Sequence, residues 1–228
     1  MKKSDYKLIV GVFGTQNTGK STFINDVIAE SAASTPNEDT DASLSWSKYG
    51  DDYRDVIARR GLKINRNGNL ESQSIIHSVL VHNIMNAVNE NAFKRMIMDR
   101  TVIDSFAYTY WHYKYSNADT GITKKDIERM WEQVLYLARM FDSLIWIPLS
   151  RCENVQLVDD KFRDTNVEYR QQIDDIMGAI WKRLRNEGCN MDVIFGSRDK
   201  RVQWFLEDKV FLLESNKENH CADIDFLV

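Results

Sequence analysis

The 228-residue chain is long enough for one α/β domain with a substantial core, and we expect residues 1–228 to form a single domain. Its net charge of −4 at pH 7 excludes a global basic field that would attract nucleic acid or an anionic membrane. No apolar run approaches the roughly 18 residues that a membrane span needs. The amino-terminal residues contain no apolar signal segment, so we expect a cytoplasmic protein with no membrane partner.

The first part of the chain begins with an apolar strand, predicted over residues 7–13, and a helix, predicted over residues 22–30. A small, polar and acidic stretch over residues 31–43 follows, and its composition predicts a mobile loop. Residues 44–48 are then predicted to form a short second strand.

The middle of the chain continues the alternation of helices and strands. Residues 51–60 are predicted to form a helix, and apolar residues at helical spacing predict a long helix over residues 70–91. The next strand, over residues 94–99, is apolar and ends abruptly in an acidic residue. Two helices follow, over residues 101–116 and 123–141, and Thr123 is the expected cap of the second.

The last part of the chain starts with a buried strand over residues 143–149. It continues with a loop over residues 153–163, a long charged helix over residues 164–186, a strand over residues 190–195, a short helix over residues 201–206 and an edge strand over residues 210–213. Strands that alternate with helices predict an α/β fold of three layers, a parallel sheet of about five strands with helices on both faces.

The segment between the first strand and the first helix has the spacing Gly-x-x-x-x-Gly-Lys-Ser. This is the P-loop pattern, in which backbone N–H groups of a tight, glycine-rich turn surround the phosphates of a nucleotide. Lys20 is expected to reach the β- and γ-phosphates, and the Ser21 hydroxyl to bind Mg²⁺, so the pattern predicts a P-loop NTPase fold with ATP and Mg²⁺ as cofactors. The expected phosphate-binding residues are Gly14, Thr15, Gln16, Asn17, Thr18, Gly19, Lys20, Ser21 and Thr22.

An aspartate and an arginine stand together at the end of the strand predicted over residues 94–99. Because ligand-binding loops lie at the carboxyl ends of parallel strands, Asp99 is expected beside the P-loop, where a carboxylate holds Mg²⁺ directly or through water. Arg100 adds a guanidinium group that can bind a phosphate. Both residues are therefore candidate catalytic residues.

The segment that these two residues open resembles the Asp-Arg-Tyr-x-x-Ser-Ser-x-Ala-Tyr stretch of thymidylate kinases and, more loosely, the Glu-Arg-Ser stretch of deoxynucleoside kinases. The shared positions are Asp99, Arg100, Ser105, Ala107 and Tyr108. The resemblance implies that Arg100 contacts the acceptor and that Asp99 lies near the metal or the nucleophile. The chain as a whole is also similar to phage-type P-loop kinases related to the ribosylnicotinamide kinase domain.

Residues 153–170 are similar to the lid of nucleoside monophosphate kinases, whose arginines close over the transferring phosphoryl group. Guanidinium groups in a closing lid stabilise the charge on the equatorial oxygens and exclude water. The resemblance makes Arg163 and Arg170 candidate catalytic residues, with a solvated helix start as the alternative. Gly196 and Ser197 resemble the turn that borders adenine in such kinases, with an ordinary turn as the alternative.

The candidate acceptor residues are spread over three predicted helices. The amide of Gln73 can pair with a base edge, as the corresponding helix does in deoxynucleoside kinases, and Arg59 can reach an acceptor phosphate. Tyr108 and Trp111 can stack on a base. The competing interpretations are core packing for the aromatic residues and a surface position for Arg59.

The phosphate loop, the Asp-Arg pair, the lid arginines and the Gly-Ser turn occur in the order that a nucleotide kinase needs. We therefore expect Mg²⁺·ATP-dependent phosphoryl transfer to a (deoxy)nucleoside monophosphate or a nucleoside. One alternative is a kinase that acts on 5-hydroxymethyluracil within DNA, with DNA as the partner. Another is a regulatory NTPase switch, although the chain has no Asn-Lys-x-Asp guanine signature. The acceptor and the oligomeric state, a homodimer included, stay open.

Overall fold

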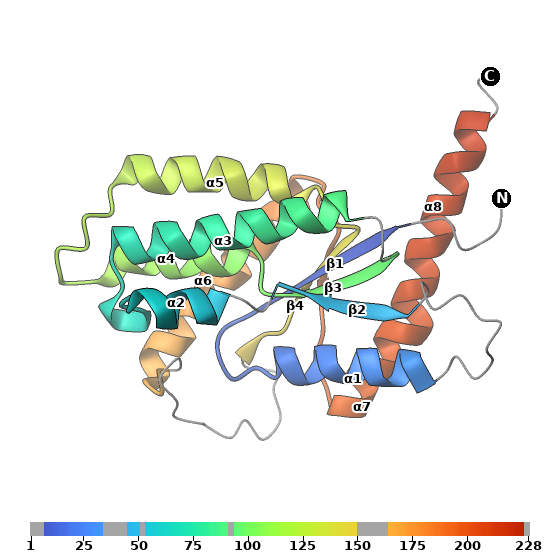
Figure 1. The fold of residues 1–228 in the computed structure, drawn as a ribbon, viewed down its shortest axis with the longest axis horizontal. Coiled ribbons are helices and arrows are strands. Elements are labelled where there is room, and N and C mark those ends of the chain that lie inside the picture. Colours follow the sequence, from blue (N-terminus) through green and yellow to red (C-terminus); the bar gives the residue numbers. More distant parts are fainter. Residues whose placement is uncertain (1–6, 34–44, 51–52, 91–93, 150–163, 226–228) are drawn as a thin grey trace.

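A five-stranded parallel sheet forms the centre of the molecule (Figure 1). The computed structural model describes residues 7–33, 45–50, 53–90, 94–149 and 164–225. The strands are β1 (Leu8–Phe13), β2 (Trp46–Tyr49), β3 (Arg95–Asp99), β4 (Ser143–Trp146) and β5 (Met191–Val193). Their order is β2-β3-β1-β4-β5, and every neighbouring pair is parallel. The predicted α/β fold with a parallel sheet is confirmed, and β1 lies at its centre.

Helices cover both faces of the sheet, as predicted (Figure 1). One apolar cluster joins the sheet to α3 (Leu70–Asn89), α4 (Val102–Tyr115), α5 (Lys124–Ala138) and α6 (Val167–Asn186). A second cluster joins the other face to α1 (Lys20–Ala33), α7 (Arg198–Gln203) and α8 (Val210–Asp225). The short helix α2 (Tyr53–Arg60) packs against α3. Among the described residues, no helix is long and apolar enough to cross a bilayer.

Gly11 in β1 allows the start of α4 to approach the sheet closely. A Cβ at this position would lie 2.7 Å from Thr101 Cγ2 and 2.8 Å from side-chain atoms of Leu144 and Phe141. Thr101 is the N-cap of α4, and its hydroxyl accepts a hydrogen bond from the N–H of Ile103. Because Gly11 has no side chain, the amino-terminal end of α4 can lie directly beside the central strand.

The structure also corrects the predicted carboxyl-terminal elements. Residues 210–213, predicted as an edge strand, begin α8, which follows α7 through a π-helical segment, Trp204–Lys209. Val210 and Leu213 are buried, whereas Phe211 and Leu212 between them are exposed. This spacing of three fits one face of a helix and not the alternation of a strand, so the predicted edge strand is wrong.

Two further predictions concern segments that lie partly outside the described residues. Residues 31–33 were predicted to begin the mobile loop but form the last turn of α1, because α1 continues to Ala33. Residues 34–43 and the loop predicted over residues 153–163 are not among the described residues. The Thr123 cap of α5 is confirmed, with its side chain accepting from the Asp126 N–H.

Candidate active site

The predicted phosphate loop connects the end of β1 directly to the start of α1. Gly14, Asn17 and Gly19 have φ values of 154°, 62° and 84°, so the chain turns tightly within six residues, 14–19. A side chain at position 14 would place its Cβ 2.6 Å from the carbonyl oxygen of Ile147, and glycine is therefore required there. The loop ends at the amino terminus of α1, where backbone N–H groups and the helix dipole favour an anion.

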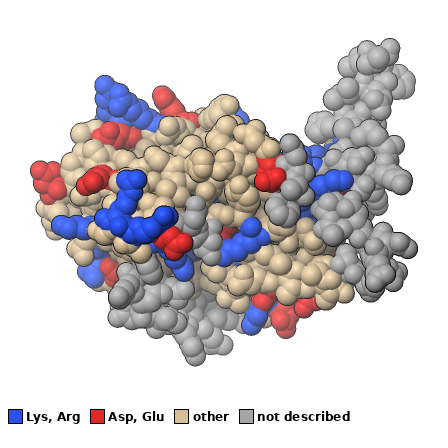
Figure 2. All heavy atoms as spheres, viewed as in Figure 1, with Lys and Arg blue, Asp and Glu red and all other residues tan. Residues whose placement is uncertain are grey.

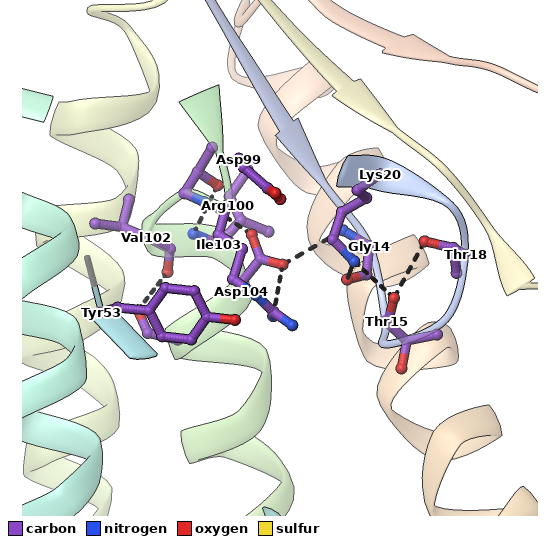
Figure 3. Close-up of polar contacts among 12 residues, drawn as sticks. Gly14, Thr15, Thr18, Lys20, Tyr53, Asp99, Arg100, Val102, Ile103 and Asp104 are labelled. Atoms are coloured by element: carbon purple, nitrogen blue, oxygen red, sulfur yellow. Dashed lines mark hydrogen bonds and ion pairs between the residues drawn. The ribbon is translucent and has the colours of Figure 1, made fainter. Parts of the chain in front are cut away.

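Lys20 is the first residue of α1, and its side chain turns back over the loop (Figure 3). Its Nζ donates hydrogen bonds to the carbonyl oxygens of Gly14 and Thr15, each at 2.7 Å. The hydroxyl of Thr18 also donates to the Thr15 carbonyl. The buried ammonium group thus lies against the backbone that would surround the phosphates.

Ser21 and Asp99 meet between α1 and the end of β3. Ser21 Oγ donates to Asp99 Oδ2 at 2.6 Å, and Lys48 Nζ from β2 lies 3.6 Å from the same oxygen. Burial alone would raise the pKa of Asp99, but Lys20 and the hydrogen bond from Ser21 bring it below its ordinary value. A hydroxyl beside an ionised carboxylate offers the hard oxygen ligands that Mg²⁺ prefers, so these two residues fit the predicted metal site.

Arg100 follows Asp99 in a left-handed backbone conformation, with a φ of 82° that is rare for a residue with a side chain. Its N–H donates to the Val12 carbonyl at 3.0 Å, which fastens the turn to β1. The guanidinium carbon lies 5.2 Å from the ring centre of Tyr53 and 5.9 Å from that of Tyr108. The strained turn therefore places the Arg100 side chain between α2 and α4.

Asp104, in the first turn of α4, is a candidate functional residue that the sequence motifs do not mark. Its Oδ2 accepts from the Thr101 N–H at 2.8 Å, and its Oδ1 accepts from the Gly14 N–H and Arg100 Nη1, each at 3.4 Å (Figure 3). Burial raises the pKa of Asp104, against the opposing effects of Arg100 and Lys20. A carboxylate three residues after an N-cap is an ordinary capping signal, so nothing in the sequence shows that this one also touches the phosphate loop.

A pocket lies beside the phosphate loop, lined by residues of α2, α3 and α4. Three predicted acceptor residues, Gln73, Arg100 and Tyr108, line it, and so does Gln16 of the loop. Gln73 is 3% exposed, and its Oε1 accepts a hydrogen bond from the Thr109 hydroxyl at 3.4 Å. The structure therefore brings these three predicted residues together next to the loop.

Two predicted acceptor residues lie elsewhere. Arg59 lines a separate surface groove with His82, between α2 and α3, where Figure 2 shows basic side chains gathered over α2 with acidic ones beside them. Ile57 of the same helix faces the pocket, and two residues along a helix turn the side chain by about 200°. Trp111 packs edge-on against Tyr169, with ring centres 4.6 Å apart, and is part of the core.

The start of α6, within the predicted lid, is attached to the phosphate loop. The side-chain amide of Gln16 donates to the Asp164 carbonyl at 2.8 Å and accepts from its N–H at 3.0 Å. Arg170 is buried, and its Nη2 donates to the Gln16 carbonyl at 3.3 Å. Arg170 therefore contacts the phosphate loop, and its role as a phosphate-binding residue stays a prediction, whereas Arg163 lies outside the described residues.

The turn that follows β5 is also connected to the phosphate loop. Gly196 has a φ of 98°, and Ser197 is the N-cap of α7. Arg201 Nε donates to the Gly196 carbonyl at 3.0 Å, while Nη1 of the same side chain donates to the Thr18 carbonyl at 3.2 Å. Arg201 thus fixes the turn predicted to border adenine relative to the loop predicted to hold the phosphates.

A phosphate loop after the central strand of a five-stranded parallel sheet in this order is the architecture of P-loop kinases. Known structures of this class resemble the chain, which confirms the predicted resemblance. Thymidylate kinase from Candida albicans is 13% identical with a TM-score of 0.62, and the match covers 93% of each chain. Deoxyadenosine kinase from M. mycoides, with bound dATP, is 14% identical with a TM-score of 0.59 and coverage of 87% and 97%.

NadR protein in complex with NR is a third structural match, with 13% identity and a TM-score of 0.53. This match covers 84% of the present chain but 44% of NadR, so the chain spans less than half of that protein. No known protein family and no curated protein matches the chain by sequence. At these identities the structural similarity establishes the fold, and the function has to be argued from the site.

Proposed function

We propose that the protein is a Mg²⁺·ATP-dependent kinase that transfers a phosphoryl group to a nucleoside or a nucleoside monophosphate. The observation that supports this most directly is the pocket lined by Gln73, Arg100 and Tyr108 beside the phosphate loop. A kinase must hold a second substrate next to the transferring phosphate, and Gln16 belongs both to the loop and to the pocket wall. A switch that only hydrolyses a nucleotide needs no such pocket.

On the donor side, backbone N–H groups of residues 14–22 bind the triphosphate, and Lys20 exchanges its contacts with two loop carbonyls for the phosphates. Ser21 and Asp99 would hold Mg²⁺, which when bound neutralises part of the phosphate charge. Gly196 and Ser197 border the adenine, because hydrogen bonds from Arg201 hold their turn beside the phosphate loop. The structural match to deoxyadenosine kinase with bound dATP supports nucleotide binding by this fold.

On the acceptor side, the amide of Gln73 binds a polar edge of the acceptor, and the Tyr108 ring contributes packing area. Arg100 contacts the reacting end of the acceptor, because its side chain lines this pocket and its Nη1 lies 3.4 Å from Asp104, which contacts the phosphate loop. Arg170 stabilises the charge that develops during transfer, with Arg163 as a further candidate.

The test is mass-resolved phosphoryl transfer from Mg²⁺·ATP to a panel of acceptors. The panel contains deoxynucleosides, their monophosphates, nicotinamide riboside and duplex DNA with 5-hydroxymethyluracil. A free acceptor that gains one phosphate supports the proposal and identifies the substrate. A phosphate gained only by the DNA would indicate a DNA-modifying kinase. Transfer of the phosphoryl group to water alone would indicate a switch. The Lys20→Met variant, run in parallel, controls for contaminating kinases.

A further inference from the structure

The described residues in the wall of the acceptor pocket are close to electrically neutral as a group. Among the described residues that line it, the charged side chains are Arg100 and Asp104. Arg100 Nη1 and Asp104 Oδ1 lie 3.4 Å apart, so the two charges offset each other. Neighbouring polar groups, such as those of Gln73 and Ser105, carry no charge. The part of the lining that the structure describes therefore offers no net positive charge to an anionic acceptor.

This charge balance separates the two acceptor classes that the proposed function allows. A phosphate monoester carries between one and two negative charges at neutral pH, with about −1.5 to −2 typical. In this pocket it would lie beside Asp104, a carboxylate that is 1% exposed, where like charges repel with little screening. An uncharged hydroxyl group can instead donate a hydrogen bond to the same carboxylate.

Asp104 also stands where donor and acceptor must meet. Its Oδ1 accepts from the N–H of Gly14, the first residue of the phosphate loop, at 3.4 Å. Figure 3 shows its carboxylate between Arg100 on one side and the loop with Lys20 on the other. A substrate in the pocket that reaches toward the loop therefore passes this carboxylate before it reaches the phosphates.

We propose that the acceptor is a nucleoside and not a nucleoside monophosphate, and that Asp104 is the base that takes the proton from its reacting hydroxyl. This inference rests on the proposed kinase function. In the transfer step, the O–H bond breaks and its proton passes to Asp104, while the oxygen forms a bond to the γ-phosphorus of ATP. The bond from that phosphorus to the β,γ-bridging oxygen breaks, ADP leaves, and the proton later passes to solvent.

The two carboxylates of the site have environments suited to different tasks. Lys20 and Ser21 keep the pKa of Asp99 below its ordinary value, as suits a metal ligand. Burial raises the pKa of Asp104, which makes its ionised form a stronger base. Two carboxylates whose pKa values are displaced in opposite directions are the arrangement by which one site divides metal binding from proton transfer.

The first test uses the unaltered protein. Each deoxynucleoside is compared with its own 5′-monophosphate as acceptor for Mg²⁺·ATP, singly and in competition. We expect kcat/KM to be at least about 100-fold higher for the nucleoside, the scale on which an unfavourable buried charge contact discriminates. A monophosphate that is used as well as its nucleoside, or better, overturns the inference while leaving the kinase proposal intact.

The second test uses Asp104→Asn, which keeps the shape of the side chain and the oxygen that faces the Thr101 N–H. We expect kcat with the nucleoside, at saturating ATP, to fall by about 10²–10³-fold. In the unaltered protein kcat should decline on the acid side as Asp104 becomes protonated, and this limb should disappear in the variant. An unchanged kcat, or an unchanged acid limb, contradicts the proton-acceptor role.

The chain offers a matched control in Asp126, which has the same capping position in α5 that Asp104 has in α4. Both carboxylates accept from the N–H of the N-cap threonine three residues earlier. Asp126→Asn should therefore reproduce any loss of helix capping without loss of kcat. If no acceptor on the panel is phosphorylated although ATP binds, the proposed function itself fails, an outcome distinct from a preference for monophosphates.

Discussion

The phosphate loop and the acceptor pocket are neighbours, yet they are built in different ways. The loop is a continuous segment, residues 14–19, that presents backbone groups, and Lys20 and Ser21 follow it directly. The pocket takes its side chains from three helices, with Tyr53 from α2, Gln73 from α3 and Tyr108 from α4. Changes in the loop should therefore reduce transfer to every acceptor equally, whereas changes in the pocket should alter which acceptor is used.

The largest loss of activity is expected from Lys20→Met, a change at the phosphate loop that should affect every acceptor alike. The substitution removes the buried ammonium group that lies over the loop carbonyls, and with it a positive charge for the developing phosphate charge. We expect kcat to fall by about 10³-fold, the scale of losing one preorganised electrostatic contact, by the same factor for each acceptor. Steady-state kinetics with two acceptors measures this, and Lys125→Met on the exposed surface of α5 is the control.

The pH dependence of stability should report on a buried histidine on the pocket side of the molecule, next to Ser105 of the pocket wall. His77 of α3 is buried, with Nδ1 2.8 Å from Ser105 Oγ on α4 and Nε2 3.0 Å from Gln133 Oε1 on α5. Burial, only partly opposed by the Gln133 hydrogen bond, lowers the pKa of His77 from 6.5 to about 4. Because the unfolded chain then binds the proton more tightly, the free energy of unfolding should decrease as pH falls from about 6.5 toward 4.

The expected loss is about 2 kcal/mol at pH 5 and about 3 kcal/mol at pH 4, relative to pH 7. Chemical denaturation at a series of pH values measures it. His77→Gln, which cannot take up the proton, should remove this part of the pH dependence. His82→Gln, on the exposed side of the same helix, should leave it in place, and an identical response from both variants would show that His77 is not the group responsible.

Gln73→Leu should impair use of the acceptor but not binding of ATP, and so separate the pocket from the phosphate loop. The substitution keeps the side chain's approximate size and removes the only polar group that Gln73 presents to the pocket. We expect kcat/KM for the acceptor to fall by about 10- to 100-fold, as for one lost hydrogen bond in a buried site, with the KM for ATP unchanged. Equal losses for the acceptor and for ATP would show that the pocket and the loop are not separate sites.

The different construction of the two regions explains what the sequence could reveal. The P-loop spacing and the apolar run before it are local patterns, so the loop, the central strand and the meeting of Ser21 with Asp99 could be predicted. Gln73, Arg100 and Tyr108 could be named one by one. That they share a pocket depends on how three helices pack, and no local pattern encodes that packing.

Asp104 and Asp126 show this limit most clearly. Each follows a threonine by three residues and caps its helix in the same way, so their local sequence signals are equivalent. One is buried against Gly14 of the phosphate loop, whereas the other lies near the surface of α5. Only the close approach of α4 to β1 at Gly11 distinguishes them, and that approach is a property of the tertiary structure.

Arg59→Ala is expected to have the smallest effect, and it tests where the acceptor site ends. Arg59 lines the groove between α2 and α3 and not the pocket, so kcat/KM for a free nucleoside should change by less than about twofold, as for other surface substitutions away from the site. Arg100→Ala, in the pocket, provides the contrast. A tenfold loss for Arg59→Ala with free nucleosides would extend the acceptor site across α2. A loss seen only with duplex DNA, and steepest at low salt, would instead indicate that the groove binds a phosphodiester backbone next to a base held in the pocket.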